Sequence, residues 1–141
     1  MKEFLSYSPE DTENFAFSLA KTLQGGTVIA FEGGMGMGKT HFTRGLARGL
    51  GFKGDVSSPT FAIINEYRGG RLPLFHFDMY RIESWEDLDS CGFFDYMNEK
   101  GVIAVEWSEN IAAALPDNTV YVTIERTGDS SRKITVEGGG F

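Results

Sequence analysis

Residues 33–40 read GGMGMGKT, and this octapeptide restricts the chain more than any other stretch. It matches G-x-x-x-x-G-K-[ST], a loop in which backbone N–H groups surround nucleotide phosphates. The apolar run 27–31 precedes it, and residues 39–50 follow with Phe42, Leu46 and Leu50 at helical spacing. The order of strand, glycine loop and helix is the context that this motif requires. The sequence therefore predicts a phosphate-binding loop between a buried strand and a helix.

The residue types in this loop fit that chemistry. Glycine permits backbone angles and close approaches that a Cβ would block, and the first turn of the helix points unpaired N–H groups at an anion. Lys39 is expected to reach the β- and γ-phosphates of ATP, and the Thr40 hydroxyl to bind Mg²⁺. The predicted ATP-binding residues of the loop are Gly33, Gly34, Met35, Gly36, Met37, Gly38, Lys39, Thr40 and His41. A merely flexible glycine loop is disfavoured by the Lys-Thr pair and the flanking elements.

Composition limits the class of protein. A length of 141 residues suits a single domain, and the single Cys91 excludes an internal disulfide and fits a reducing compartment. No apolar run approaches the roughly 18 to 20 residues that cross a bilayer, and the N-terminus lacks the apolar core of a signal peptide. We therefore expect a cytoplasmic protein. The formal charge of −7 argues against an independent nucleic-acid binder, because phosphate backbones are held by clustered Lys and Arg.

Local patterns predict the other elements. Ser8-Pro9 is typical of a helix start, and this helix is expected to run to about Leu23. Thr12, near its start, is expected either to be solvated or to line the nucleotide pocket. The further predictions are strands 61–68 and 72–80 joined by a turn at 69–70, helices in 84–89 and 92–98, a buried strand 101–106, a short helix 108–115, a hairpin of 119–126 with 132–137, and a loose tail over 138–141. Pro73 suggests an edge position for the start of its strand.

Hydrolysis of a bound nucleotide needs a second protein contact to Mg²⁺ and a group that orients the attacking water. Glu106 follows four apolar residues, the pattern of a strand buried on both faces, so we assign it to the metal. Asp78 ends a strand that alternates and contains His76 and Pro73, which indicates a more open setting, and we assign it to the water. The alternatives are a surface ion pair for Glu106 and a cap or turn role for Asp78.

The predicted catalytic residues are Asp78, Lys39 and Thr60. Thr60 follows Ser58-Pro59, in a segment able to close over the γ-phosphate and add a hydroxyl to Mg²⁺ as a switch loop does. A Ser-Pro turn before a strand is an equally good interpretation. A lone histidine is more often structural than chemical, and neither histidine of the chain has a Cys or a second His at metal-ligand spacing.

Four blocks occur together in this order: GGMGMGKTHFTRGLARGLG, SSPTFAIINEY, LFHFDMYR and VIAVEWSE. Over residues 8–110 the chain resembles the TsaE (YjeE) family of small bacterial P-loop ATPases, which are needed for threonylcarbamoyl modification of tRNA. The resemblance implies a single-domain α/β P-loop NTPase with a mixed central β-sheet flanked by helices. It also implies weak ATP hydrolysis alone and action with the TsaB and TsaD proteins, where the ATPase resets the complex between turnovers. Contact with tRNA is then expected only through these partners.

The resemblance also carries roles for single residues. By position, Thr40 and Glu106 match the Mg²⁺ ligands, Thr60 matches a switch-like Ser-Pro-Thr, and Asp78 matches the catalytic acid. Arg132 is aligned with a late arginine near the nucleotide.

Three further positions are informative. Trp107 matches an aromatic of the family pattern, for which packing near the nucleotide or against a partner are both open. Gly34 stands where the family usually has Asp, and His41 where it usually has Thr or Ser. These two departures concern affinity for the nucleotide, since neither removes the lysine or the metal-binding hydroxyl.

The same sequence bears on three other functions. A small kinase needs a lid and an acceptor-binding insertion, for which 141 residues leave little room. A GTPase is disfavoured because the chain contains no N-K-x-D motif. A binding module remains open, in which ATP occupancy and not hydrolysis regulates association with a partner.

Overall fold

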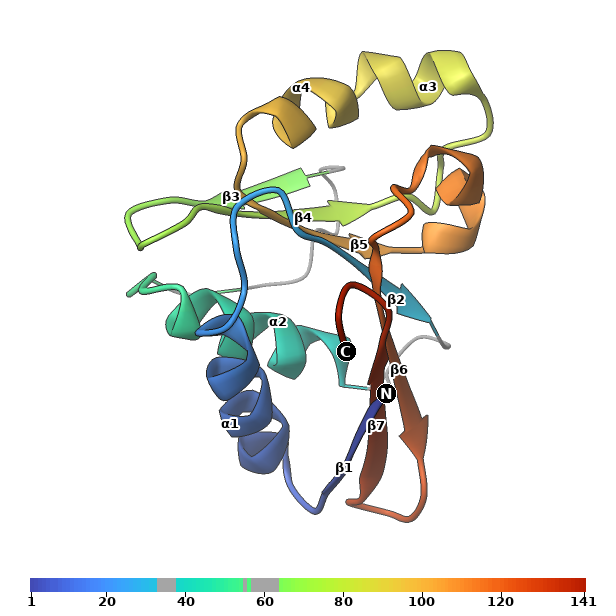
Figure 1. The fold of residues 1–141 in the computed structure, drawn as a ribbon. Coiled ribbons are helices and arrows are strands. Elements are labelled where there is room, and N and C mark those ends of the chain that lie inside the picture. Colours follow the sequence, from blue (N-terminus) through green and yellow to red (C-terminus); the bar gives the residue numbers. More distant parts are fainter. Residues whose placement is uncertain (33–37, 55, 57–63) are drawn as a thin grey trace.

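A computed structural model describes residues 1–32, 38–54, 56 and 64–141 of the chain. The described strands form one sheet in the order β1-β7-β6-β2-β5-β4-β3. The elements, in chain order, are β1 (Lys2–Ser6), α1 (Pro9–Ala20), β2 (Val28–Glu32), α2 (Lys39–Gly49), β3 (Ile64–Tyr67), β4 (Leu74–Asp78), α3 (Trp85–Ser90), α4 (Phe93–Asn98), β5 (Val102–Glu106), the 3₁₀ helix η1 (Ser108–Ala114), β6 (Val120–Arg126) and β7 (Arg132–Glu137). Figure 1 shows the sheet between two groups of helices. The mixed α/β architecture expected from the sequence is confirmed.

The centre of the sheet is parallel and its flanks are antiparallel. Strand β2 pairs in parallel with β5 and β6, and β4 pairs in parallel with β5. Hairpins add β3 to one side and β7 to the other, and β1 closes the β7 side. The carboxyl ends of the four parallel strands therefore meet at one edge, where ligands of open α/β sheets bind.

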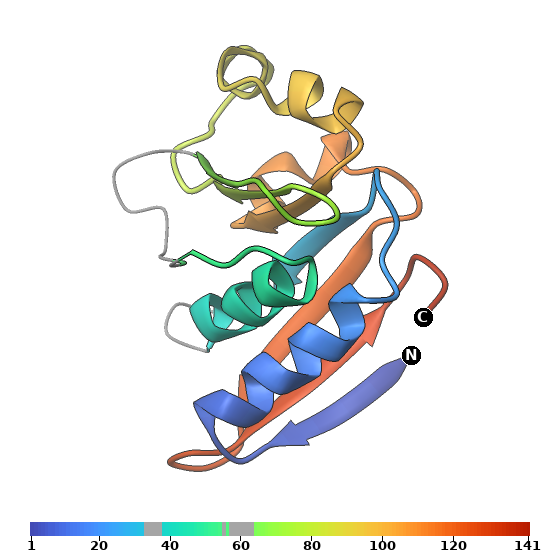
Figure 2. The same ribbon diagram turned by 90° about the vertical axis from the view of Figure 1, so that its left-hand side faces the viewer.

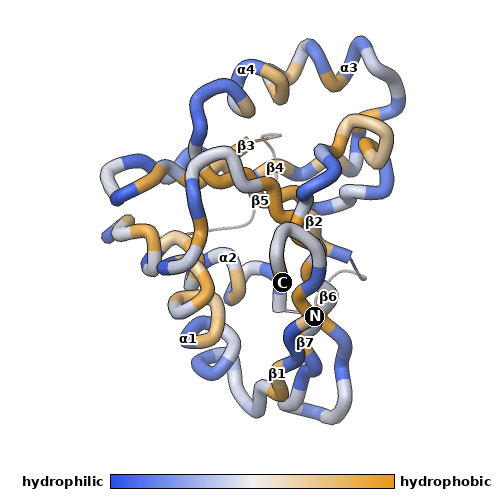
Figure 3. The backbone as a smooth tube through the Cα atoms, in the orientation of Figure 1, coloured by the Kyte–Doolittle hydropathy of each residue, from blue (hydrophilic) through white to orange (hydrophobic). Residues whose placement is uncertain are grey.

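Two clusters of buried side chains cover the two faces of the sheet. The first joins α1 and α2 to one face, and the second joins α3, α4 and η1 to the other. Figure 2 shows α1 and α2 side by side, and Figure 3 shows that the hydrophobic stretches follow the central strands. Alternate residues of β4 enter different clusters: Leu74 joins the first, whereas Phe75 and Phe77 join the second.

Helices α1 and α2 run in the same direction and touch closely. Gly45 faces Glu13 and Ala16, and Gly49 faces Phe17, so that a Cβ at either glycine would collide with the backbone of α1. Each glycine costs the helix about 1 kcal/mol relative to alanine. In return, the absence of a Cβ at these two positions allows the two helices to pack closely.

Most predicted elements are confirmed. Ser8 caps α1 through its side chain, which accepts a hydrogen bond from the Asp11 N–H at 3.1 Å. The loop strand, the helix after the loop, the buried strand β5 and both hairpins lie where the sequence placed them. The helix predicted over 108–115 is a 3₁₀ helix with a kink at Ile111.

One interpretation was incorrect, and one strand was missed. Strand β4 is not at an edge, because it pairs with both β3 and β5. Pro73 stands just before it, and the Pro73 carbonyl still accepts a hydrogen bond from the Val102 N–H at 2.9 Å. Strand β1 was not predicted at all.

The C-terminal residues expected to form a loose tail instead make a turn. The Phe141 N–H donates to the Gly138 carbonyl at 2.9 Å, and the Phe141 ring packs against the first core cluster. None of the helices in the described ranges combines the length and apolar character needed to cross a membrane.

Candidate nucleotide site

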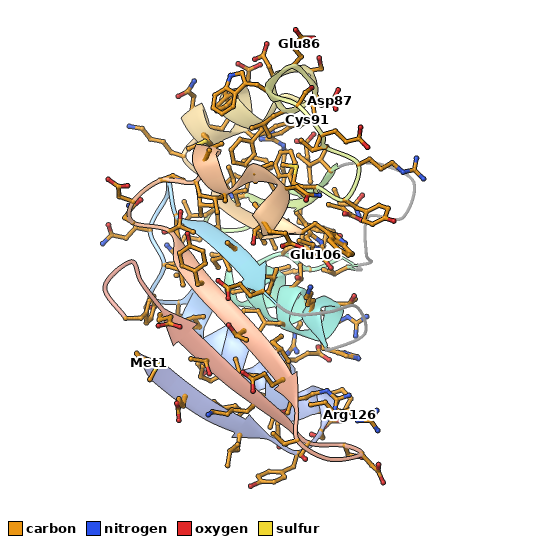
Figure 4. The ribbon with its side chains drawn as sticks, turned by 90° about the vertical axis from the view of Figure 1, so that its right-hand side faces the viewer. Met1, Glu86, Asp87, Cys91, Glu106 and Arg126 are labelled. Atoms are coloured by element: carbon orange, nitrogen blue, oxygen red, sulfur yellow. The ribbon has the colours of Figure 1, made fainter. Side chains whose placement is uncertain are left out.

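The two predicted acids lie next to each other at the carboxyl edge of the sheet. Asp78 and Glu106 are register partners at the ends of β4 and β5. Strand β5 lies between β4 and the loop strand β2. Figure 4 places Glu106 near the middle of the molecule, far from Arg126 on the β6–β7 hairpin. Parallel pairing thus brings both carboxylates to the edge at which β2 ends, at Glu32.

Glu106 is held by a buried histidine. The Nε2 atom of His76 lies 2.6 Å from Oε2 of Glu106, with the His76 side chain fully buried and that of Glu106 18 % exposed. The other ring nitrogen, Nδ1, has no hydrogen-bond partner among the residues that the structure describes. An unpaired polar group in such a place costs about 1–3 kcal/mol. The surface ion pair considered for Glu106 is therefore replaced by a contact that reaches into the core.

Asp78 is the last residue of β4, and its side chain bonds to the turn that follows. Its Oδ1 accepts a hydrogen bond from the Tyr80 N–H at 2.9 Å, the local role considered as its alternative. The Asn110 side chain donates to the carbonyls of Met79 and Tyr80, and the Met79 N–H donates to the Glu106 carbonyl. The more open setting inferred for the Asp78 strand was wrong, since the first four residues of both β4 and β5 are buried. The two acids differ in their contacts and not in the burial of their strands.

The loop helix begins as the motif requires. Gly38 precedes α2 with a left-handed backbone (φ 98°), a conformation that favours glycine. Lys39 is 7 % exposed, and its carbonyl accepts a hydrogen bond from the Thr43 hydroxyl at 2.9 Å. Thr40 is half-buried in the first turn. The remaining loop residues, 33–37, and Thr60 lie outside the described residues.

A serine connects the loop strand to β5. The buried Ser108 hydroxyl, two residues after Glu106, donates to the Phe31 carbonyl near the end of β2 at 3.0 Å. This bond joins the segment that carries one acid to β2, the strand that precedes the predicted phosphate-binding loop.

Three further candidates have partners within the protein. Thr12 is buried rather than solvated, and its hydroxyl lies 2.7 Å from that of Ser6. Arg132 is the register partner of Ser6, and its Nη1 donates to the Ser131 carbonyl at 2.9 Å. His41 lies in the first turn of α2, with Nδ1 3.5 Å from Oε2 of Glu13. These residues stand on the same side as the loop helix, but their described contacts are to the protein.

Trp107 makes an aromatic contact beside the acids. Its ring meets that of Tyr80 edge to face, with centroids 4.8 Å apart, and its backbone is left-handed (φ 59°). Tyr80 is 60 % exposed. The pair therefore joins the segments that follow Asp78 and Glu106.

The sequence alone did not assign a role at the site to three residues. His76 lies on the same side of its strand as Asp78, which the alternation indicated, but its contact with Glu106 depends on the pairing of β4 with β5. Ser108 and Asn110 carried no signal beyond their position after Glu106.

The donor atoms at this edge suit magnesium. Mg²⁺ prefers oxygen ligands and is commonly bound by one or two protein groups together with phosphates and water. A carboxylate from β5 and a hydroxyl from α2 fit this pattern. Among the described residues no group of three or more His, Cys, Asp or Glu side chains gathers as a self-sufficient metal site.

Known proteins match the chain over most of its length. A family model described as "Threonylcarbamoyl adenosine biosynthesis protein TsaE" matches residues 6–134. The chain is 42 % identical over 133 residues to the tRNA threonylcarbamoyladenosine biosynthesis protein TsaE of Bacillus subtilis, covering 94 % of this chain and 83 % of that protein. It is 38 % identical over 132 residues to the protein of the same name in Treponema pallidum, covering 94 % and 97 %.

A solved structure has the same fold. The crystal structure of Bacillus subtilis YdiB superimposes with a TM-score of 0.82 at 38 % identity, covering 99 % of this chain and 86 % of that chain. The family match over most of the chain and the identity of these relatives show that the protein belongs to the TsaE family.

Proposed function

We propose that this protein binds and hydrolyses ATP in support of the threonylcarbamoyl modification of tRNA adenosine, acting with TsaB and TsaD. The observation that carries the proposal is the register pairing of Asp78 with Glu106 at the edge where the loop helix begins. The family description supplies the link to threonylcarbamoyl adenosine, and the relatives' names supply the link to tRNA. The net charge of −7 supports contact with tRNA through partners.

Each residue has a task in this mechanism. Loop N–H groups and Lys39 bind the phosphates, and Thr40 and Glu106 hold Mg²⁺. Bound Mg²⁺ supplies positive charge that stabilises the charge developing on the phosphates. Asp78 accepts the hydrogen of the attacking water and orients it toward the γ-phosphorus. Thr60, outside the described residues, is assigned the role of a switch-type residue at the γ-phosphate.

Asp78 can act in this way while it keeps its present contact. Its Oδ1 accepts from the Tyr80 N–H, and a carboxylate has further lone pairs on both oxygens that can accept from water. We expect slow turnover by the isolated protein and faster turnover when partners order the site. A partner arginine would contribute a further factor of about 10³ to 10⁵.

The test is ATP hydrolysis measured with and without a TsaB–TsaD pair from one bacterium. We expect slow, Mg²⁺-dependent hydrolysis by the protein alone and a marked increase with the pair. No binding of ATP under any condition would contradict the proposal, and an unchanged rate with the pair would reject activation by partners. Action beside tRNA-modifying proteins, together with the single cysteine, also leads us to place the protein in the cytoplasm.

One observation favours the second candidate, a binding module controlled by ATP occupancy. The turn contact of Asp78 is a sufficient structural reason for the residue, without any catalytic role. In that case occupancy by ATP, and not its hydrolysis, releases or recruits the partners.

A further inference from the structure

The contact between His76 and Glu106 is not required for packing. His76 lies in the middle of β4, and its side chain faces the same side as that of Leu74, which belongs to the apolar cluster under α1 and α2. A leucine or methionine would fill this position without placing a polar ring in the core. Within the described part of the chain the ring nitrogen Nδ1 has no hydrogen-bond partner, so the histidine makes this interior less favourable than an apolar residue would.

The neighbouring strand is shaped to let the ring reach Glu106. The register partner of His76 on β5 is Ala104, whose side chain is a single methyl group. Glu106 lies two residues further along β5 and so on the same side of the strand. The ring crosses diagonally over Ala104, and its Nε2 lies 2.6 Å from Oε2 of Glu106.

We propose that His76 is a positioning residue that holds the carboxylate of Glu106 for magnesium. The Nε2–H of His76 donates to Oε2, which restricts rotation of the carboxylate and leaves Oε1 as the oxygen presented to the ion. This inference rests on the proposed function, in which Glu106 is a ligand of Mg²⁺. His76 itself touches neither metal nor nucleotide.

The expected size of the effect follows from other metal sites. Carboxylate ligands are themselves hydrogen-bonded, and loss of such a support typically lowers metal affinity or activity by about 10- to 100-fold. The quantity that reports on it is the ratio of nucleotide affinity with Mg²⁺ to nucleotide affinity without Mg²⁺. A change that only loosens the core lowers both affinities together and leaves this ratio unchanged.

The experiment compares three variants with the wild type by binding of a non-hydrolysable ATP analogue in the presence of Mg²⁺ and of a chelator. His76→Leu removes the donor and keeps an apolar core. His76→Gln keeps an amide N–H near the position of Nε2. Phe75→Leu is the matched control, because it removes a fully buried ring from the same strand on the opposite face, away from Glu106.

We expect His76→Leu to lower the ratio of nucleotide affinity with Mg²⁺ to affinity without Mg²⁺ by about tenfold or more. In His76→Gln and Phe75→Leu this ratio should stay within about threefold of wild type. An unchanged ratio in His76→Leu, or an equal loss in His76→Gln, would overturn the proposal. If the wild type itself shows no dependence on Mg²⁺, the proposed metal site fails, which is a different result.

A second measurement needs no nucleotide. ¹⁵N NMR of the imidazole in the free protein reports which ring nitrogen carries a proton. Donation to Glu106 requires a hydrogen on Nε2. A bare Nε2 with the hydrogen on Nδ1 would overturn the proposal even if His76→Leu does not fold.

Discussion

The ends of β4 and β5 carry the same chemistry in different surroundings. Asp78 and Glu106 are paired in register, and each follows four buried residues. Glu106 is anchored sideways by a side chain buried in the sheet, whereas Asp78 bonds to the backbone of the turn that follows it. Parallel pairing therefore determines where the two acids are, and their contacts determine how freely each can move.

This difference suits the two tasks proposed for them. A metal ligand works best when it is fixed before the ion arrives, because ordering the ligand would otherwise subtract from affinity. A group that orients water must adapt as the nucleotide and the partners close the site. The contrast leads to experiments on each strand end in turn.

The largest effect is expected for Asp78→Asn. Loss of the acid should lower ATP turnover by about 10² to 10⁴-fold, since that is the usual contribution of a positioned acid or base. The amide oxygen can still accept from the Tyr80 N–H, so the turn and ATP binding should persist. Turnover, ATP affinity and association with TsaB–TsaD are measured together.

This variant also separates the two candidate functions. If the variant binds ATP, fails to hydrolyse it and no longer supports tRNA modification, hydrolysis is needed. Modification that continues without hydrolysis would favour the binding module and remove the assignment of Asp78 to the attacking water.

Glu106→Ala should have the next largest effect. We expect Mg²⁺-dependent nucleotide binding to weaken by about 10- to 100-fold, with a smaller change in binding without metal. Glu106→Gln is a matched variant, because its amide oxygen can still accept from His76 while the charge is lost. Equal losses with and without Mg²⁺ would reject the metal assignment and remove the contrast between the two strand ends.

The sequence was sufficient for the parts of the fold that depend on local order. The loop motif, the four apolar residues before Glu106 and the cap at Ser8 each define an element within a few residues. Strand β1 was missed because its pairing partner, β7, lies at the other end of the chain. The position of β4 was misjudged because a proline at the start of a strand loses only a donor, and its carbonyl still joins the sheet.

The candidate site, like the fold, was predictable only where local sequence order determines it. The residue types and their order indicated which acids lie near the loop, and the sheet brings them to one edge. The roles of His76 and Ser108 depend on contacts between strands that are distant in sequence, and no local pattern reports them. Periodicity tells which side a residue faces, whereas only the register tells what it meets there.

A smaller effect, on stability, should distinguish the hydrogen bonds that hold the end of β5 from those that hold the end of β4. Ser108→Ala removes a buried bond between the β5 segment and β2, and we expect it to lower the free energy of unfolding by about 1–2 kcal/mol. Asn110→Ala removes more exposed bonds to the turn after β4 and should cost about 0.5–1 kcal/mol. Urea denaturation measures both. A larger loss for Asn110→Ala would reverse the view that the β5 end is the more firmly held.

The smallest effect concerns a third carboxylate, at the other end of the β3–β4 hairpin and outside the site. Glu66 accepts hydrogen bonds from the Tyr96 hydroxyl and from Arg68, both at 2.8 Å, and these bonds hold the pKa of Glu66 below its usual value of 4.5. A lowered pKa adds stability above the unfolded pKa, and that stability is lost as pH falls through the folded value.

Tyr96→Phe removes the hydrogen bond that lowers the pKa of Glu66 most. Because Glu66 is exposed, we expect a loss below about 1 kcal/mol at neutral pH, fading as the pH falls below the usual carboxyl range. Urea denaturation at several pH values measures it. A loss that persists at low pH would instead come from packing of the Tyr96 ring against Phe75 and Phe77. The result gives the stability that a hydrogen-bonded carboxylate contributes where solvent screens it. This value is the reference for Glu106, whose hydrogen-bond partner is buried.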